Sequence, residues 1–283
     1  MRLAFLADIH GNLPALEAVI TDLQRHSPDA VYLVGDQINR CPWTNEVLDL
    51  LDELGWQRIF GNHEYIISRI RTPENFPPFT EQKRFPTLWW TQAQLSAAHL
   101  ANMRQLPAEL TLTFGSAPAI YMTHGIPGNC FRGFVAEDGD AKFFDALASI
   151  QPNYVIVAHT HRPLNHKVGR WHVLNPGSVG LPYNGDPRAQ YLLLNLKDGK
   201  WMPEFCQIDY DLGRLSAAFN NSKMRQEVGP EVELHLKTAL TGLPWSSDFS
   251  YWLQFQPPHL QQDLAEAIPQ YLETHGPGNW AFR

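Results

Sequence analysis

The 283-residue sequence predicts an α/β fold that contains more than one β-sheet and ends in a helical extension. Three observations support this prediction. Strand-like and helix-like apolar patterns alternate over residues 2–60, which indicates parallel strands joined by right-handed crossovers. Further β-type segments follow at 170–174, 189–195 and 201–207, and the last of them, Trp201 to Gln207, suggests a second, more antiparallel sheet. From residue 211 onward the apolar spacing is mainly helical.

The first element is a short buried strand, predicted over residues 2–7 and ended by Asp8. A helix should follow, because Asn12 is a favourable N-cap and Pro14 falls in the first turn, where its missing N–H group does no harm. The apolar residues of this helix recur on one face: Leu13, Leu16, Val19, Ile20 and Leu23.

Two further strands are predicted at 30–34 and 56–60, with a helix at 46–54 between them that stops at Gly55. The pattern changes after them. Residues 66–90 contain four prolines and little periodicity, while residues 91–105 are helical in pattern, so the stretch 66–108 is predicted to be an insertion or cap.

The remaining elements complete one large domain. They are predicted as strands at 110–114, 118–123 and 154–158 and a helix at 139–149. We expect residues 1–210 to form this domain and residues 211–283 to form a helical extension packed on it.

The composition is that of an ordinary globular protein, with 44% hydrophobic and 18% charged residues. A net charge of −7 argues against a nucleic-acid partner, and an acidic protein that handles an anionic substrate needs local positive charge, which metal ions could supply. The three cysteines are too few and too widely spaced for a disulfide framework or a zinc ribbon: Cys41, Cys130 and Cys206.

No targeting or membrane segment is evident. The apolar run within residues 1–8 is too short for a signal peptide, and no apolar stretch approaches the ~18–20 residues of a membrane span. The sequence therefore predicts a cytoplasmic protein without a membrane partner.

Polar side chains follow the predicted strands at the point where each strand ends. Asp8, Asp36, Asn62, His124 and His159 each come within a residue or two of such an end. Because the carboxyl ends of parallel strands meet at one edge of a sheet, we expect these side chains to converge there. An H-x-H pair projects both imidazoles to one side of an extended segment, so His161 should join His159.

The donor types in this set predict a metal site. The expected ligands are two carboxylates, one carboxamide and four imidazoles: Asp8, His10, Asp36, Asn62, His124, His159 and His161. Mixed oxygen and nitrogen donors suit Mn²⁺, Fe²⁺, Zn²⁺, Co²⁺ or Ni²⁺ better than Ca²⁺. Seven ligands exceed the needs of one ion and suit two ions about 3.5–4 Å apart, bridged by a carboxylate and a nucleophilic hydroxide that would attack a phosphoester.

These residues fall into five blocks, in the order Asp8-Ile9-His10, Gly35-Asp36, Gly61-Asn62-His63-Glu64, His124-Gly125 and Ala158-His159-Thr160-His161. The blocks resemble the signature of the calcineurin-like metallophosphoesterase superfamily, D-x-H, G-D, G-N-H-(D/E), H and G-H-x-H. Residues 175–188 also resemble the segment that follows the last block in the bacterial YfcE-type phosphodiesterase branch. Five ordered blocks within residues 8–161 are a specific signal, whereas D-x-H alone is weak.

The resemblance implies a fold and a set of metal ligands. Two mixed β-sheets should pack face to face with helices outside, as an αββα sandwich. Two divalent ions are implied, drawn from Mn²⁺, Fe²⁺/Fe³⁺, Zn²⁺, Ni²⁺ and Co²⁺, with Mn²⁺ favoured. One ion would be held by Asp8, His10 and His161, the other by Asn62, His124 and His159, with Asp36 bridging them.

The resemblance also implies roles beside the metals. His63 would stabilise the transition state or act as general acid, and Glu64 would orient it. Three positions depart from the family pattern. Ala158 replaces a glycine, Leu181 stands where relatives often have a polar residue, and Asn39-Arg40 replaces the Asp-Arg pair of phosphoprotein phosphatases. Arg40 is nevertheless a candidate phosphate contact.

The expected function is hydrolysis of phosphodiester or phosphomonoester bonds in a small phosphorylated substrate. One alternative is a phosphatase of nucleotides, dinucleoside polyphosphates or phosphoproteins, and another is a non-catalytic interaction scaffold. Residues 211–283 carry no catalytic block and are a candidate partner surface or homo-oligomer interface. Histidines outside the blocks are interpreted as surface or packing residues, namely His26, His99, His166, His172, His259 and His275.

Overall fold

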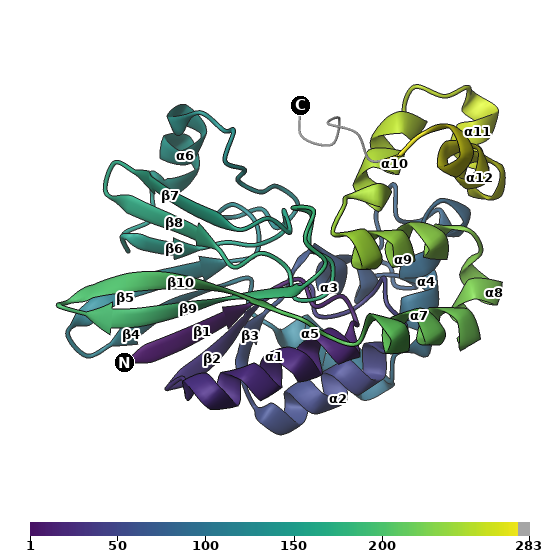
Figure 1. Ribbon diagram of the computed structural model, residues 1–283. Coiled ribbons are helices and arrows are strands. Elements are labelled where there is room, and N and C mark those ends of the chain that lie inside the picture. The colour runs from purple at the N-terminus through teal and green to yellow at the C-terminus, as the bar shows by residue number, and fades with distance from the viewer. Residues whose placement is uncertain (277–283) are drawn as a thin grey trace.

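The computed structural model describes residues 1–276, in which two five-stranded β-sheets pack face to face (Figure 1). The strand order is β10-β9-β1-β2-β3 in the first sheet and β4-β5-β6-β8-β7 in the second. Helices α1, α2 and α6 lie on the outer faces of the sandwich, and the remaining helices gather at one end of it. The α/β sandwich with C-terminal helices that the resemblance implied is therefore confirmed.

The first sheet combines the N-terminal strands with two late ones. Its parallel strands are β1 (Arg2–Leu6), β2 (Ala30–Val34) and β3 (Gln57–Ile59). Strand β9 (Ala189–Lys197) extends it by pairing antiparallel with β1, and β10 (Lys200–Ile208) pairs antiparallel with β9 at the edge. The prediction that residues 201–207 belong to a second sheet is wrong, because the apolar pattern of a strand does not encode which strand edge it pairs with.

The second sheet is built from the middle of the chain. Its strands are β4 (Glu109–Phe114), β5 (Ala117–Thr123), β6 (Tyr154–Ile156), β7 (Leu164–Val168) and β8 (Trp171–Asn175). Strands β5, β6 and β8 are parallel, and β4 and β7 are antiparallel edges. Strand β7 was not predicted, since its sequence LNHKV carries three polar residues, as an edge strand tolerates.

Alternation along β1 shows how the layers are held together. Leu3 and Phe5 point into the core between the sheets, while Ala4 and Leu6 point outward against helix α1 (Leu13–His26). Both faces are buried, which explains the unbroken apolar run of the strand. Helix α2 (Thr44–Leu54) covers the same sheet, and α6 (Asp140–Leu147) covers the second one.

The predicted helix ends are present. The Oδ1 atom of Asn12 accepts a hydrogen bond from the N–H group of Ala15 at 3.3 Å, and Gly55 ends α2 in the left-handed conformation. The single helix predicted at 91–105 is instead divided between two helices. Ser96 begins the second one by accepting a bond from the N–H group of His99, so a local cap overrides the helical periodicity.

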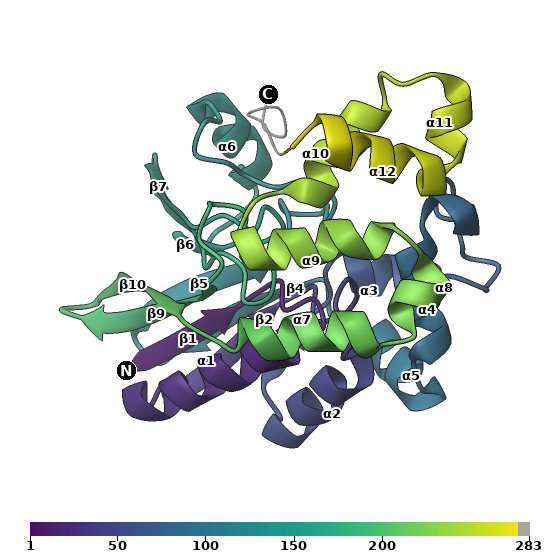
Figure 2. The same ribbon diagram turned by 45° about the vertical axis from the view of Figure 1, so that its right-hand side comes forward.

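Helices from two distant parts of the chain form one layer across the end of the sandwich (Figure 2). The inserted part contains α3 (Asn62–Ile67), η1 (Gln82–Arg84), α4 (Pro86–Gln94) and α5 (Ala97–Gln105). The C-terminal part contains α7 (Leu212–Asn221), α8 (Met224–Val228), α9 (Glu231–Thr241), α10 (Trp245–Leu253), α11 (Pro258–Gln262) and α12 (Leu264–Thr274). Helix α4 packs against α8 and α9, which joins the two parts.

Among residues 1–276, no helix is long and apolar enough to cross a membrane. The three cysteines are unpaired thiols, as their spacing predicted.

Candidate metal centre

The side chains of the centre are delivered by strands of both sheets. Asp8 follows β1 and Asp36 follows β2, whereas His124 follows β5 and His159 follows β6. Asn62 begins helix α3 shortly after β3. Because these strands end at the same rim of the sandwich, residues as far apart in sequence as Asp8 and His161 meet at one point.

The backbone at this rim is held in an uncommon conformation. Five of the seven expected ligands have left-handed φ angles: 54° at Asp8, 51° at His10, 52° at Asp36, 69° at His159 and 56° at His161. Such a conformation costs a non-glycine residue on the order of 1–3 kcal/mol and persists only where the surroundings enforce it. Ala158 is outside this region, so the replacement of the usual glycine there carries no backbone strain.

Steric constraints explain why two positions of the signature blocks are glycine. A Cβ atom on Gly61 would lie 2.2 Å from Oδ1 of Asp36, and one on Gly35 would lie 2.6 Å from Nδ1 of His124. Gly35 also has a φ angle of 86°. Any side chain at these two positions would displace a metal-site residue.

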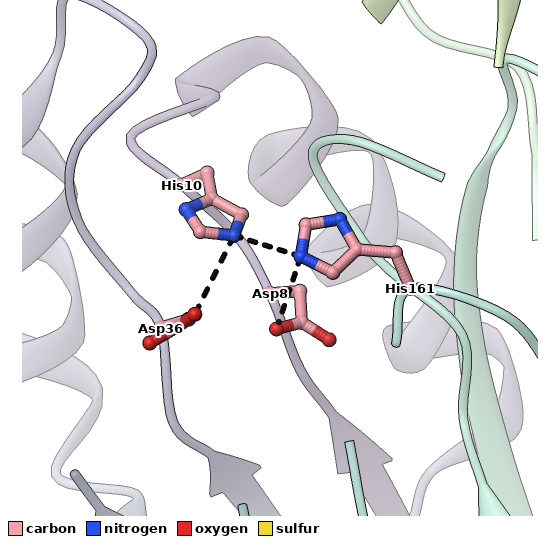
Figure 3. Close-up of side chains that lie close together, drawn as sticks. All are labelled: Asp8, His10, Asp36 and His161. Carbon is pink, nitrogen blue, oxygen red and sulfur yellow. Dashed lines mark hydrogen bonds and ion pairs between the residues drawn. The ribbon is translucent and has the colours of Figure 1, made fainter. Parts of the chain in front are cut away.

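One group of donor atoms contains Asp8, His10, Asp36 and His161, which Figure 3 shows pointing toward a common centre. Each side chain offers one donor atom, an imidazole nitrogen or a carboxylate oxygen, and these four atoms all lie within 4.8 Å of one another. The Nε2 atom of His10 is 3.0 Å from Nε2 of His161 and 3.7 Å from Oδ2 of Asp36. The Nε2 atom of His161 is 3.5 Å from Oδ1 of Asp8.

A second group contains Asp36, His124 and His159. The Oδ2 atom of Asp36 is 3.3 Å from Nε2 of His124. The Oδ1 atom of Asn62 joins this group, 3.1 Å from Nε2 of His124 and 2.9 Å from Nδ1 of His159. Asp36 thus belongs to both groups, which is the geometry expected of a bridging carboxylate.

Backbone carbonyls orient three of the imidazoles. The Nδ1 atoms of His10, His124 and His161 face the carbonyl oxygens of Ile38 at 3.2 Å, Val34 at 2.7 Å and Leu181 at 2.6 Å. Because a carbonyl oxygen only accepts, each Nδ1 must donate its hydrogen, which leaves the lone pair of a neutral ring on Nε2, directed at the centre. The side chain of Leu181 is fully buried, so this residue contributes its carbonyl group and not a polar side chain.

The charge balance of the cluster fits a cation. Both carboxylate oxygens of Asp8 are buried and have no hydrogen-bond partner among the described residues. Burial accordingly raises the pKa of Asp8 well above its usual range, and repulsion from Asp36 adds to the effect. Burial would also lower the pKa of His124, but the nearby Asp36 and Asp8 raise it to about 10. Without metal, a proton on Nε2 of His124 therefore balances part of the negative charge, and a divalent ion would take the place of that proton.

His63 lies beside the metal groups, with its Nε2 atom 3.9 Å from Oδ2 of Asp36. Its Nδ1 atom lies 2.7 Å from the side-chain nitrogen of Asn39, whose oxygen in turn accepts a hydrogen bond from the hydroxyl of Thr91. An amide N–H group directed at Nδ1 places the ring hydrogen on Nε2, facing the site. Burial lowers the pKa of His63 to about 3, with Asp36 opposing the shift.

Glu64 contacts backbone amides, and Asn39 takes the place beside His63 that the resemblance had assigned to Glu64. One oxygen of Glu64 accepts from the N–H groups of Gln37 and Ile38, and the other from those of Asp36 and Gly61. This carboxylate therefore ties the Asp36 loop to the start of helix α3.

Replacing Glu64 by Gln should destabilise the protein by about 3 kcal/mol, because the amide group would direct N–H donors at backbone N–H groups that then lose their acceptor. Urea denaturation of the metal-free protein measures the change. Glu46→Gln is the matched control, since Glu46 is exposed on α2, and we expect a change within about 0.5 kcal/mol for it. Equal urea midpoints for the two variants would contradict the role of Glu64 in holding the Asp36 loop against helix α3.

Arg40 lies at the edge of the centre with a φ angle of 73°. Its Nη1 atom donates to the hydroxyl of Tyr183 at 3.1 Å, while its buried Nε atom has no partner among the described residues. The ring of Tyr183 stacks on His161 with centroids 4.3 Å apart. An N–H donor without a partner next to the metal groups is suited to an anionic ligand, and the phosphate contact itself stays a prediction.

A pocket of about 580 Å³ opens from this edge. Its inner end is lined by Asn39, Arg40, Asn62 and His63, and its walls come from the inserted segment, from Phe131 and from helices α9 to α12. Four polar residues of this wall were not among the site residues expected from the sequence: Thr87, Glu231, His235 and Ser246. The only sequence signal for them is the spacing of Glu231 and His235, which places the two on one face of a helix.

A two-sheet sandwich with a buried Asp/His cluster at its strand ends defines a metal-dependent phosphoesterase. Residues 1–199 match the model of the calcineurin-like phosphoesterase superfamily domain, so the chain belongs to this superfamily, and its resemblance to the YfcE-type branch is confirmed.

Three relatives illustrate the match. Phosphodiesterase YfcE of Escherichia coli is 26% identical over 206 residues, covering 69% of this chain and 88% of its own. The uncharacterized protein MJ0912 of Methanocaldococcus jannaschii is 24% identical over 250 residues, covering 82% and 97%. The crystal structure of a metallophosphoesterase from Sphaerobacter thermophilus superposes with a TM-score of 0.66 at 24% identity, covering 84% of this chain and all of the other.

Proposed function

We propose that this chain hydrolyses phosphodiester or phosphomonoester bonds with two divalent metal ions. The observation that carries the proposal is Asp36, which belongs to both groups of donor atoms. Asp8, His10 and His161 would complete the site of one ion, and Asn62, His124 and His159 that of the other. When bound, such ions supply Lewis acidity toward phosphate oxygens and lower the pKa of a coordinated water.

The residues around the centre have separate tasks in this proposal. His63 would donate a hydrogen bond from Nε2 to a phosphate or leaving-group oxygen, with Asn39 holding its tautomer. Arg40 would contact a non-reacting phosphate oxygen through its unpaired Nε–H group. The main-chain carbonyls that orient the imidazoles would keep the ligands in place before the substrate binds.

Diesters are the preferred substrates in this proposal, for two reasons. The relative with a stated activity is named a phosphodiesterase. A neutral carboxamide at Asn39 also stands where phosphoprotein phosphatases carry the acid of their Asp-Arg pair, which argues against that alternative. We further propose Mn²⁺ as the working metal.

We expect chelated protein to hydrolyse neither bis(p-nitrophenyl) phosphate nor p-nitrophenyl phosphate. Adding Mn²⁺, Co²⁺, Ni²⁺ or Zn²⁺ should raise the rate by at least about 100-fold, whereas Ca²⁺ should not, because imidazole-rich sites disfavour it. The rates, and the metal content after dialysis, are measured for each ion. One ion per chain with full activity would contradict the dinuclear site, and no activity with any ion would favour a scaffold.

A further inference from the structure

The pocket beside the metal centre contains a hydrogen-bonded chain of four side chains that the hydrolysis itself does not use. It links Ser246 on α10, His235 and Glu231 on α9, and Thr87 on α4. All four line the pocket. His235 is 3% exposed, so its ring has little water to bond with and depends on these partners.

The chemistry of the groups sets the direction of this chain. The hydroxyl and the backbone N–H group of Thr87 both donate to Oε2 of Glu231. With its hydrogen used in this way, the Thr87 oxygen can only accept from Nε2 of His235, 3.2 Å away. The hydrogen of a neutral His235 is then on Nε2, and its Nδ1 atom accepts from the hydroxyl of Ser246 at 3.0 Å.

The consequence concerns Ser246. Its single hydroxyl hydrogen is committed to His235, so toward the pocket this oxygen offers lone pairs only. Burial, and after it the charge of Arg40, lowers the pKa of His235 well below its usual range, which agrees with a neutral ring. Ser246 is therefore a fixed hydrogen-bond acceptor and not an adaptable hydroxyl.

Beyond its inner end and this chain of side chains, the pocket wall combines apolar groups with polar ones, which include Arg84, Ser247, Gln254 and Gln261. Aromatic rings gather in the wall, where Phe79 lies 5.0 Å from Phe85 and 6.4 Å from Phe131 between ring centroids. Phe249 and Leu264 face the same space. A volume of about 580 Å³ is within the range of pockets that bury an organic ligand and is larger than a phosphate group needs.

We propose that this pocket binds an apolar, ring-containing organic group of the phosphoester, and that Ser246 selects substrates in which this group carries a hydrogen-bond donor. The inference rests on the proposed function, since the ester bond must reach the metal centre at the inner end of the pocket. A substrate without the donor leaves the oxygen of Ser246 buried and unpaired, which disfavours its binding.

The test compares p-nitrophenyl phenyl phosphate with its analogues in which the phenyl ring carries a meta- or para-hydroxymethyl group. With Mn²⁺ present, the wild-type protein should hydrolyse the better hydroxymethyl ester with a kcat/KM at least about tenfold higher, mainly through KM. Ser246→Ala should reduce this preference to near unity. Ser246→Cys, which keeps the size but accepts hydrogen bonds weakly, should do the same.

Ser250→Ala is the matched control, because Ser250 lines the same pocket on the same helix but donates its hydroxyl hydrogen to the backbone carbonyl of Ser246. It should keep the wild-type preference. Equal kcat/KM values for all three esters in the wild-type protein, or an unchanged preference in both Ser246 variants, would overturn the inference and leave the proposed function intact. Hydrolysis of none of the esters would overturn the proposed function and this inference with it.

Discussion

Asp8→Asn is expected to abolish metal-dependent hydrolysis while leaving the metal-free protein at least as stable as the wild type. Both carboxylate oxygens of Asp8 are buried without a hydrogen-bond partner among the described residues, so the burial of this carboxylate opposes folding unless a cation is bound. A neutral amide relieves this cost but is a poorer metal ligand. We expect a loss of kcat/KM of about 1,000-fold or more, on the order of 4 kcal/mol of transition-state stabilisation.

Two sets of measurements check this result. Urea denaturation is followed in chelator and in excess Mn²⁺, and rates are measured on bis(p-nitrophenyl) phosphate. Asp22→Asn is the control, because Asp22 is also buried but accepts a hydrogen bond from the hydroxyl of Tyr191 at 2.6 Å. That variant should lose stability with and without metal and keep its activity. If Asp8→Asn lost stability in chelator as Asp22→Asn does, Asp8 would have a structural role instead.

His63→Ala should retain both metal ions and lose about 100- to 10,000-fold in kcat, because His63 faces the site but belongs to neither group of ligand atoms. The loss should be larger for esters with poor leaving groups, since those depend most on hydrogen-bond donation to the departing oxygen. Metal content by elemental analysis and kcat on esters of graded leaving-group pKa are the measurements.

His99→Ala controls for removing a buried imidazole, because His99 lies between Asn45 and Asp49 and away from the centre. It should keep kcat near the wild-type value. A His63 variant with full rate on a poorly activated ester would show that the role assigned to His63 is incorrect.

The metal centre could be predicted from sequence because its geometry follows from local features. Each expected ligand comes after a short apolar strand, and strands that run in parallel deliver their carboxyl ends to the same rim. His124 and Asp36 are 88 positions apart, yet one rule places both at that rim. The two sheets were harder to assign. Strand β9 pairs with β1, and nothing in its own residues distinguishes that edge from the edge of the other sheet.

The pocket wall could not be predicted, because it depends on how distant helices pack. The contact between Thr87 and Glu231 joins residues 144 positions apart on helices whose amphipathic patterns specify only that each has a buried face. Asn39 illustrates the same limit. In the sequence this residue is only a departure from a family pattern. Its position beside His63 depends on a left-handed backbone conformation with a φ angle of 73°.

Because helices form a layer across the end of the sandwich, different stretches of the chain supply the expected metal ligands and the outer pocket wall. All seven expected metal ligands lie within residues 8–161, whereas most of the outer pocket wall is supplied by helices after residue 230. Mutations in the later helices can therefore retune which esters are admitted without altering the reagents that cleave them. Because the two sets of residues are separate, substrate specificity can change while the metal-site residues stay the same.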